Sequence, residues 1–299
     1  MSDNRHADGR AGIDAALVRR LVAAQFPQWS GLPVEPVEVD GWDNRTYRLG
    51  PDMTVRLPTG PTYALAVEKE HRWLPVLAPR LPVEIPEPLG LGRPGEGYPH
   101  HWAVRRWIDG QTADPSRIDD MTAFAEAVAG FITALQAADP TGGPAGGEHS
   151  FQRGADPAHY DAQTRETLRE LEGRVDTAAA ARVWEAALAA RWTGEPVWFH
   201  GDIAQGNLLT RDGKLAAVID FGTSGVGDPA CDLVIAWTMF EGASREAFRR
   251  AVAQDEATWA RARGWAIWKA LLLVSWDHAE AQASRRVIDA VIAEHEALR

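Results

Sequence analysis

The pattern of apolar and polar positions divides the chain into a β-rich first part and a helical second part. Ile13, Leu17, Leu21 and Ala24 recur at helical spacing and predict an amphipathic helix over 13–26. In the same part, short alternating segments predict strands at 34–39, 46–49, 53–57 and 101–108, and the pattern predicts a helix over 63–77. The polar residues 41–45 are expected to form a turn, and the prolines between 79 and 99 exclude a helix there.

The second part begins after Asp109-Gly110, where the pattern changes to helical. It predicts helices over 116–138, 157–173, 177–192 and most of 228–298, with a loop at 140–147. A compact β section is expected at 197–221, with a hairpin turn at Asp212-Gly213. We therefore expect a disordered tail at 1–12, an N-terminal unit at 13–108 and a C-terminal unit at 109–299, and a nucleotide could bind in a cleft between two such units.

Composition narrows the class of protein. Of 299 residues, 45% are apolar and 24% charged, which are ordinary values for a globular protein. The single cysteine, Cys231, excludes an internal disulfide and a cysteine-based zinc site. No apolar run approaches the ~20 residues that span a membrane, and no signal peptide is expected at the N-terminus. These features favour a cytoplasmic protein.

Net charge argues against some partners. The chain carries a formal charge of −11, and residues 111–299 hold 28 acidic but only 18 basic residues. Such a field repels nucleic acid and anionic membranes and attracts cations, so we expect neither of the first two as a partner. An acidic surface also simply keeps a protein in solution.

One segment carries residues suited to phosphoryl transfer. Asp202 and Asn207 lie five residues apart in a predicted loop, and Asp220 ends an apolar strand after the hairpin. Phosphoryl transfer needs a carboxylate that orients the attacking hydroxyl and hard oxygen ligands for Mg²⁺. Turn chemistry alone explains Asp202 or Asn207 but not Asp220. A hairpin folds back, so we expect Asp220 to return beside Asn207.

These motifs resemble those of a known family. His200-Gly201-Asp202 with Asn207, followed by Ile219-Asp220-Phe221-Gly222, is similar to the catalytic and metal-binding motifs of the aminoglycoside and macrolide phosphotransferases, antibiotic kinases that share the protein-kinase fold. The segment 227–233 also matches. The resemblance runs from about residue 40 to the C-terminus and is loosest in the last helices. It implies an α+β, bilobal, protein-kinase-like fold with a small β-sheet N-lobe and a large helical C-lobe.

The resemblance also implies roles for residues of the C-terminal unit. Asp202 would be the catalytic base that orients the acceptor hydroxyl, and Asn207 and Asp220 would be the Mg²⁺ ligands. His200 would hold the loop through hydrogen bonds. Asp228, which precedes a proline, is expected to cap a helix, and Asp232 to be a supporting or capping group.

The N-terminal unit would then hold the nucleotide, ATP or GTP. Its hairpin at 41–46 has a single glycine in place of a glycine-rich loop, so side chains such as Asn44 are expected to help. Arg56 stands where kinases carry a lysine and would grip the phosphates. Its acidic partner is expected on the following helix, where Glu70 fits the family spacing better than Glu68.

A strand before Asp109-Gly110 resembles the connector between kinase lobes. There the carbonyl of Arg106 and the amide of Ile108 would recognise the purine, and such backbone contacts do not distinguish ATP from GTP. In the helical unit, Trp265 and Trp268 share a helix face. Indole faces suit sugar rings, but plain core packing is the reading we favour for both.

The predicted reaction transfers the γ-phosphoryl group of ATP or GTP, with Mg²⁺, to a hydroxyl of an aminoglycoside- or macrolide-like antibiotic and so inactivates it. The acidic C-terminal unit favours a cationic acceptor, and a monomer or a dimer is expected. A metabolite kinase of the choline-kinase or homoserine-kinase type uses the same motifs and stays open, as does a non-catalytic nucleotide-binding protein. A protein kinase is disfavoured, because His-Gly-Asp lacks an arginine and no Ala-Pro-Glu follows.

Overall fold

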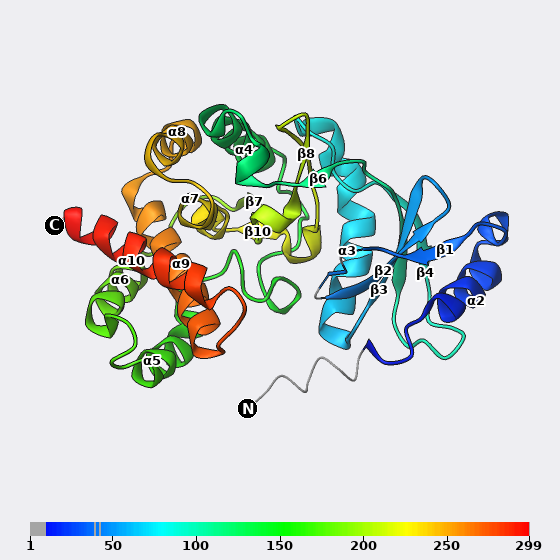
Figure 1. The fold of residues 1–299 in the computed structure, drawn as a ribbon, viewed down its shortest axis with the longest axis horizontal. Helices are drawn as coiled ribbons and strands as arrows, with labels where there is room; N and C mark the ends of the chain where they lie inside the picture. Colours follow the sequence, from blue (N-terminus) through cyan, green and yellow to red (C-terminus); the bar gives the residue numbers. More distant parts are fainter. Residues whose placement is uncertain (1–9, 39, 42, 299) are drawn as a thin grey trace. The chain divides into compact units, whose positions relative to one another are not determined.

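The computed structural model describes residues 10–38, 40–41 and 43–298, in two compact units (Figure 1). The expected tail therefore lies almost wholly outside the described residues, as does Trp42 of the expected hairpin. The first unit extends to Arg80, resumes at Glu84–Asp109 and also contains Ala217–Gly222. The second unit consists of Leu81–Val83, Gly110–Ala216 and the described residues from Thr223 onwards.

A five-stranded antiparallel sheet forms the centre of the first unit. Its order is β1-β2-β3-β5-β4, and the strands are β1 (Val34–Pro36), β2 (Asn44–Leu49), β3 (Met53–Pro58), β4 (Pro88–Gly92) and β5 (Trp102–Arg106). The polar turn expected at 41–45 is wrong in part, because β2 already begins at Asn44. Pairing of Asn44 with Pro58 and of Arg45 with Leu57 extends the strand into residues whose polarity indicated a turn.

Two helices accompany this sheet, α2 (Ala15–Gln25) and α3 (Pro61–Leu77). The buried face of α2 contributes Leu17, Val18, Leu21 and Val22 to a core shared with β-strand residues such as Val55 and Leu57. Asp14 caps the start of α2, where its Oδ1 accepts a hydrogen bond from the amide of Leu17 at 2.7 Å. Strand β3 is thus fixed by its neighbours, and Arg56 on it is held in place.

The second unit is mainly helical. Its helices are α4 (Met121–Gln136), α5 (Asp161–Glu170), α6 (Thr177–Ala189), α7 (Ile235–Thr238), α8 (Gly242–Val252), α9 (Glu256–Ser275) and α10 (Ala281–Ala297). Helix α4 begins at Met121 instead of residue 116, because Asp120 accepts the amides of Thr122 and Ala123 and so caps a start five residues later. The helix expected over 157–173 is likewise shorter, since Pro157–Tyr160 form a 3-10 turn before α5.

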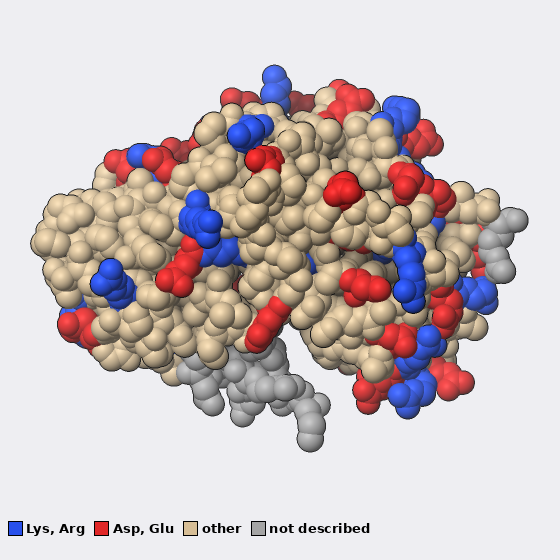
Figure 2. All heavy atoms as spheres, turned by 180° about the vertical axis from the view of Figure 1, so that it is seen from behind, with Lys and Arg blue, Asp and Glu red and all other residues tan. Residues whose placement is uncertain are grey.

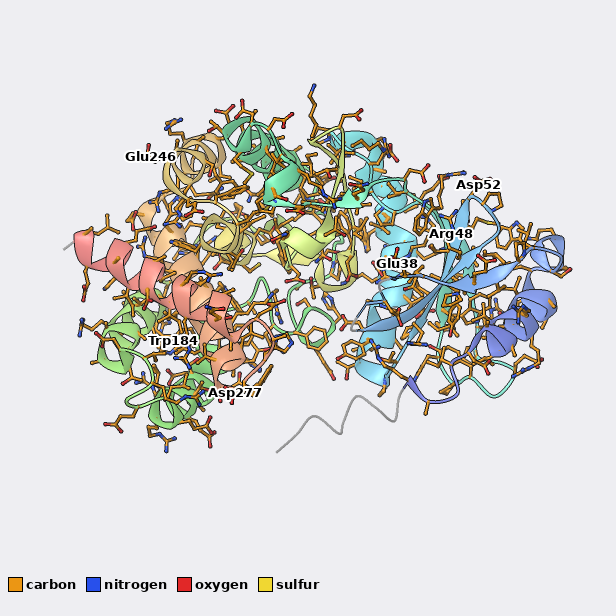
Figure 3. All side chains as sticks on the ribbon, viewed as in Figure 1. Glu38, Arg48, Asp52, Trp184, Glu246 and Asp277 are labelled. Atoms are coloured by element: carbon orange, nitrogen blue, oxygen red, sulfur yellow. The ribbon has the colours of Figure 1, made fainter. Side chains whose placement is uncertain are left out.

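Close packing fixes α9 within this unit. Trp184 lies on α6 (Figure 3). It is buried, and its indole N–H donates a hydrogen bond to Oδ1 of Asp161 at 2.9 Å. A side chain added at Gly264 of α9 would meet the Cβ of Ala187 at 2.4 Å, so the glycine allows α9 to approach α6 closely. This approach sets the position of the residues that α9 presents to the site.

Short strands position the loops of the second unit. Strand β7 (Val197–Phe199) pairs with β10 (Gly225–Gly227), and a second sheet has the order β6 (Gln111–Thr112), β8 (Leu208–Arg211), β9 (Lys214–Val218). The expected hairpin turn is confirmed, with Asp212 and Gly213 at φ of 50° and 71° between β8 and β9. The compact β section expected at 197–221 is confirmed in part: β7, β8 and β9 lie within it, but β7 pairs with β10, which lies beyond it.

Charged side chains of both signs are interspersed on the face drawn in Figure 2. Within the described part of the chain, no helix combines the length and the apolar character that a membrane span needs.

Candidate functional site

The loop after β7 is held by a buried carboxylate. Asp232 accepts the backbone amides of His200 at 2.8 Å and Gly201 at 2.6 Å. Gly201 has a φ of +87°, and a Cβ there would lie 2.8 Å from the carbonyl oxygen of Thr223, so only glycine fits. The His200 ring accepts the amide of Asp202 at 3.2 Å through Nδ1. His200 therefore has the structural role that the sequence predicts, and the loop presents Asp202 in one orientation.

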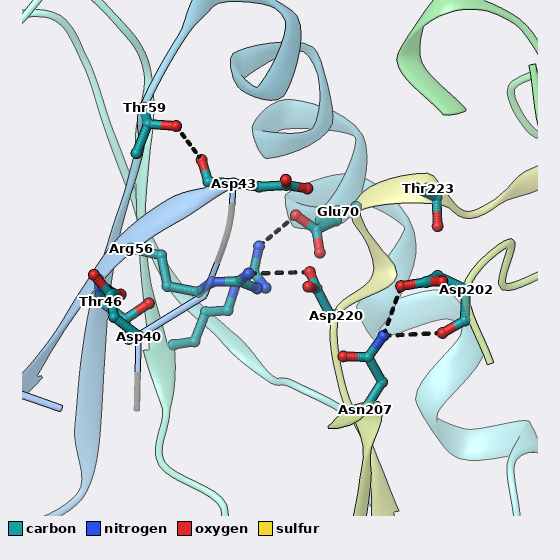
Figure 4. Close-up of polar contacts among 12 residues, drawn as sticks. Asp40, Asp43, Thr46, Arg56, Thr59, Glu70, Asp202, Asn207, Asp220 and Thr223 are labelled. Carbon is teal, nitrogen blue, oxygen red and sulfur yellow. Dashed lines mark hydrogen bonds and ion pairs between the residues drawn. The ribbon is translucent and has the colours of Figure 1, made fainter. Parts of the chain in front are cut away.

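Both carboxylate oxygens of Asp202 have partners. The side-chain amide of Asn207 donates to Oδ2 at 3.1 Å and to the backbone carbonyl of Asp202 at 2.9 Å (Figure 4). The ammonium group of Lys269 lies 2.9 Å from Oδ1. Burial raises the pKa of Asp202, but Lys269 and, with a smaller effect, Arg153 outweigh it and lower the pKa to about 2. Asp202 is therefore ionised at neutral pH and oriented through both oxygens.

Lys269 was missed by the sequence reasoning. It lies on α9, far from the motifs in the chain, and no local pattern connects it to Asp202. All three basic side chains of α9 hold carboxylates: Arg261 binds Asp228, Arg263 binds Glu256 and Glu294, and Lys269 binds Asp202. Isolated cations in a helix whose other residues are largely apolar are the one signal that could have indicated such pairs.

Asp228, directly after β10, binds a second basic side chain of α9. Its carboxylate forms a bidentate pair with Arg261, at 2.7 Å to Nε and 3.0 Å to Nη2, and both side chains are buried. Oδ1 also accepts the amide of Ala230 at 3.1 Å, so Asp228 caps the 3-10 turn Pro229–Val234 as the sequence predicts. These contacts anchor α9 to the segment that follows β10.

In the first unit, Arg56 pairs with Asp220. Nη2 of Arg56 on β3 lies 3.0 Å from Oδ1 of Asp220, which follows β9 (Figure 4). Burial alone would lower the pKa of Arg56, but Asp220 and Glu70 raise it above its ordinary value. Asp220 has a φ of +67°, a left-handed conformation that aspartate tolerates better than most residues. The local backbone therefore turns the Asp220 carboxylate towards the sheet of the first unit.

Glu70 does not make the expected contact. Its carboxylate pairs with Nη2 of Arg105 at 2.5 Å, and both side chains are buried. The register pairs Thr54 with Arg105 and Arg56 with Ala103, so the two arginines project from neighbouring strands towards α3. The expected pair of Glu70 with Arg56 is corrected accordingly: Arg105, a second cation that the sequence reasoning did not consider, takes Glu70, and Arg56 takes Asp220.

A lysine next to Glu70 contacts the segment after Asp220. The ammonium group of Lys69 donates to the carbonyl of Gly222 at 2.7 Å. Burial lowers the pKa of Lys69 to about 8, although Glu70 and Asp220 act in the opposite direction. This contact ties α3 to Asp220–Gly222 and was also missed by sequence reasoning.

The expected nucleotide loop is closed by a side chain in place of glycines. Oδ1 of Asp40 accepts a hydrogen bond from the backbone amide of Thr46 at 2.9 Å, and Oδ2 accepts one from Nη1 of Arg45 at 2.8 Å. Asn44 is the first residue of β2, opposite Pro58. Its contact with a nucleotide stays a prediction.

The expected purine-binding connector follows β5. The amide of Arg106 donates to the carbonyl of Glu87 at 2.9 Å, and its exposed guanidinium pairs with the Glu87 carboxylate. Ile108 lies two residues beyond the strand. These two contacts use the amide and the guanidinium of Arg106, not the Arg106 carbonyl or the Ile108 amide that are assigned to the purine. The role of that carbonyl and that amide stays a prediction.

The donor chemistry of Asn207 and Asp220 suits Mg²⁺. Because Nδ2 of Asn207 donates to Asp202, the amide is oriented and presents its oxygen as an acceptor. Asp220 supplies a carboxylate, and carboxylate and amide oxygens are hard ligands of the kind that Mg²⁺ takes. Among residues 10–38, 40–41 and 43–298, no group of three or more His, Cys, Asp or Glu side chains forms a metal cluster by itself. Water molecules and the phosphates of a bound nucleotide would supply further oxygens.

The tryptophans of α9 lie in the core. Trp265 and Trp268 are 3% and 6% exposed, and Tyr160 stacks on Trp268 with ring centroids 4.3 Å apart. The core-packing interpretation is confirmed for both. They support the helix turn that carries Lys269 and do not form an open platform for a sugar.

The sequence of the chain matches that of a known protein family. Residues 34–265 match the phosphotransferase enzyme family, APH. Among proteins with curated descriptions, none matches the sequence.

Solved structures show the same fold. The GDP and kanamycin complex of APH(2")-IIia superposes with a TM-score of 0.71 at 18% identity, covering 94% of this chain and 99% of that one. The gentamicin–APH(2")-IIa complex gives 0.62 at 16% identity, covering 95% and 96%. Macrolide 2'-phosphotransferase MphH from Brachybacterium faecium gives 0.58 at 24% identity, covering 94% and 97%. The predicted kinase-like α+β fold is therefore confirmed.

Proposed function

Because the chain belongs to the phosphotransferase enzyme family, we propose that it is a kinase that transfers the γ-phosphoryl group of ATP or GTP to a hydroxyl of a small molecule, with an aminoglycoside- or macrolide-like antibiotic as the acceptor. The observation that carries the proposal is the environment of Asp202. Its carboxylate is ionised, and Asn207 and Lys269 fix both of its oxygens. A purely structural turn does not need a charged group held in this way.

Asp202 orients the acceptor hydroxyl in the proposed reaction. A carboxylate with a pKa of about 2 is too weak a base to remove the proton of an alcohol in the ground state. It can accept a hydrogen bond from the hydroxyl and take the proton late, as bond formation to phosphorus lowers the pKa of that hydroxyl. This order suits phosphoryl transfer, whose transition state is loose and leaves most of the catalysis to positioning and electrostatics.

The residues that the resemblance assigns to the nucleotide and its metal would take the following roles. Asn207 and Asp220 would bind Mg²⁺, which when bound neutralises phosphate charge. Arg56 would hold phosphate oxygens, with its guanidinium oriented by Asp220. Asn44 and the backbone of Arg106 and Ile108 would complete the nucleotide site. Complexes of similar proteins with GDP and with ADP support a nucleotide as co-substrate.

Two observations support the antibiotic as acceptor. Similar folds are known in complex with kanamycin and gentamicin, and others are macrolide 2'-phosphotransferases. The acidic excess of residues 111–299 would also attract a cationic acceptor at long range.

The test is a panel of acceptors. Purified protein with Mg²⁺ and either ATP or GTP is incubated with aminoglycosides, macrolides, choline and homoserine, and release of ADP or GDP is measured. We expect release that depends on an antibiotic and on Mg²⁺. Release with choline or homoserine alone would instead assign the chain to a metabolite kinase, and the absence of release with every acceptor would contradict the proposal.

A further inference from the structure

Lys269 is a basic group at the proposed reaction centre. Its ammonium lies 2.9 Å from Oδ1 of Asp202, the carboxylate assigned to the acceptor hydroxyl. We propose that Lys269 is a further catalytic residue, whose ammonium stabilises the γ-phosphoryl group while it passes to the hydroxyl held by Asp202. This inference rests on the proposed function.

The exposure of the pair argues against a purely structural role. The side chains of Lys269 and Asp202 are 40% and 35% exposed, whereas Arg261 and Asp228, which join the same helix to the fold, are 3% and 2% exposed. An ion pair that is only half-buried adds less to stability than a fully buried one would lose when broken, because water partly screens it and ordering the long side chain costs entropy. The Arg261–Asp228 pair already anchors α9. Lys269 is thus a partly exposed cation beside the carboxylate that is assigned to the acceptor hydroxyl.

The catalytic loop itself supplies no cation. Between Asp202 and Asn207 the sequence is Ile-Ala-Gln-Gly, without a basic side chain. Phosphoryl transfer spreads negative charge over the equatorial oxygens of the phosphoryl group, and a cation there raises the rate strongly. An ammonium group has three donors and a flexible stem, so Lys269 can keep one hydrogen bond to Asp202 and direct another to a phosphoryl oxygen.

The other cation near Asp202 is committed elsewhere. The guanidinium of Arg153 lies over the ring of Trp268, 5.3 Å from its centroid, and donates to the carbonyl of Phe151 at 3.3 Å. It lowers the pKa of Asp202 only as a smaller contribution after Lys269. Lys269 is therefore the group placed to meet the phosphoryl directly.

The proposed phosphoryl transfer leaves the charge of Lys269 unchanged. The acceptor oxygen forms a bond to the γ-phosphorus, and the bond from that phosphorus to the bridging oxygen breaks. The electron pair leaves with ADP or GDP, and the proton of the hydroxyl passes to Asp202 and then to solvent. No proton leaves Lys269, which acts through its charge and its hydrogen bonds.

Steady-state kinetics of Lys269→Met and Lys269→Arg test the proposal, with Lys214→Met on the exposed part of β9 as the matched control. We expect Lys269→Met to lower kcat by about 10²–10³-fold, the usual effect of removing one group that stabilises transition-state charge. The KM for nucleotide should change less than about threefold, and Lys269→Arg should recover part of kcat. Lys214→Met should behave as the wild type. A kcat for Lys269→Met equal to or above that of the wild type would overturn the inference.

A second measurement does not depend on the acceptor. Wild type and Lys269→Met are titrated with Mg²⁺–ADP or Mg²⁺–GDP, with and without fluoroaluminate, a mimic of the transferring phosphoryl, and the midpoint of thermal unfolding is recorded. We expect equal stabilisation by the diphosphate but a loss of the additional stabilisation by fluoroaluminate in the variant. Equal responses to fluoroaluminate overturn the role of Lys269 while leaving the proposed function intact. A wild type that turns over no nucleotide with any acceptor overturns both.

Discussion

Glu70 on α3 forms its ion pair with Arg105 on β5, and both groups are buried. One oxygen of Glu70, Oε1, and one nitrogen of Arg105, Nη1, have no hydrogen-bond partner among the residues that the structure describes. The pair is therefore sensitive to the loss of either member. It also releases Arg56 to bind Asp220, which is the arrangement on which the proposed nucleotide site depends.

Removal of Arg105 alone should destabilise the protein strongly. Arg105→Met leaves the Glu70 carboxylate buried without a cation, and breaking such a pair typically costs about 3–5 kcal/mol. The double variant Glu70→Leu with Arg105→Met should recover most of this loss. Urea unfolding of the three proteins measures the effect. A double variant that is as unstable as Arg105→Met would show that the charge pair is not the cause.

Arg56 should contribute mainly to nucleotide binding. Arg56→Ala removes charge-assisted hydrogen bonds worth about 1.5–3 kcal/mol, so the KM for ATP or GTP should rise about 10–100-fold. Arg56→Lys should retain part of the affinity, since it keeps the charge but loses the forked geometry. Arg80→Ala, at an exposed position of the same unit, serves as the control. An unchanged KM in Arg56→Ala would remove Arg56 from the nucleotide site.

The pH dependence of kcat reports on the partners of Asp202. Its pKa of about 2 means that the wild type should lose no activity through Asp202 between pH 5 and pH 8. In Lys269→Met the effect of burial, which raises this pKa, is no longer opposed by the lysine. The acidic limb of the profile should therefore move to higher pH in the variant. Profiles that coincide would contradict the assigned electrostatics.

Asp232 should make the free energy of unfolding fall as the pH rises towards 7. Burial raises its pKa to about 7, well above the ~3.9 of an unfolded aspartate. Between these two values the folded chain binds the proton and the unfolded chain does not, so this group stabilises the fold at low pH and the contribution is lost as pH rises towards 7. Asp232→Asn should flatten that part of the curve of unfolding free energy against pH. An identical slope in wild type and variant would count against a raised pKa.

The sequence predicted those parts of the fold and site that depend on local patterns. Apolar periodicity identified α3 and β3, and the Asp-Gly dipeptide identified the turn between β8 and β9, because both effects act within a few residues. Polarity failed at Asn44, where pairing with Pro58 across the sheet extends a strand through polar residues. A local pattern contains no information on such a partner.

Long-range contacts could not be predicted from spacing. The segment Ala217–Gly222 belongs to the first unit, where the amide of Val218 donates to the carbonyl of Glu84 at 3.0 Å. A boundary at a single position in the chain cannot assign this later segment to the first unit. The ion pairs of Lys269 and Arg105 could not be predicted for the same reason. Each is an ordinary basic residue in its own helix or strand, and only the folded chain brings it next to a carboxylate.

The most direct test of the account is phosphoryl transfer by Asp202→Asn. The variant keeps the size of the side chain and a hydrogen-bonding group next to Asn207, so the loop should remain folded. With an acceptor found in the panel, the phosphorylated product is followed by ³¹P NMR, and nucleotide affinity by calorimetry. We predict that kcat falls by about 10²–10⁴-fold, the usual contribution of a general base, while nucleotide affinity stays within about twofold. A variant that forms the phosphorylated product at the wild-type rate would contradict the central claim.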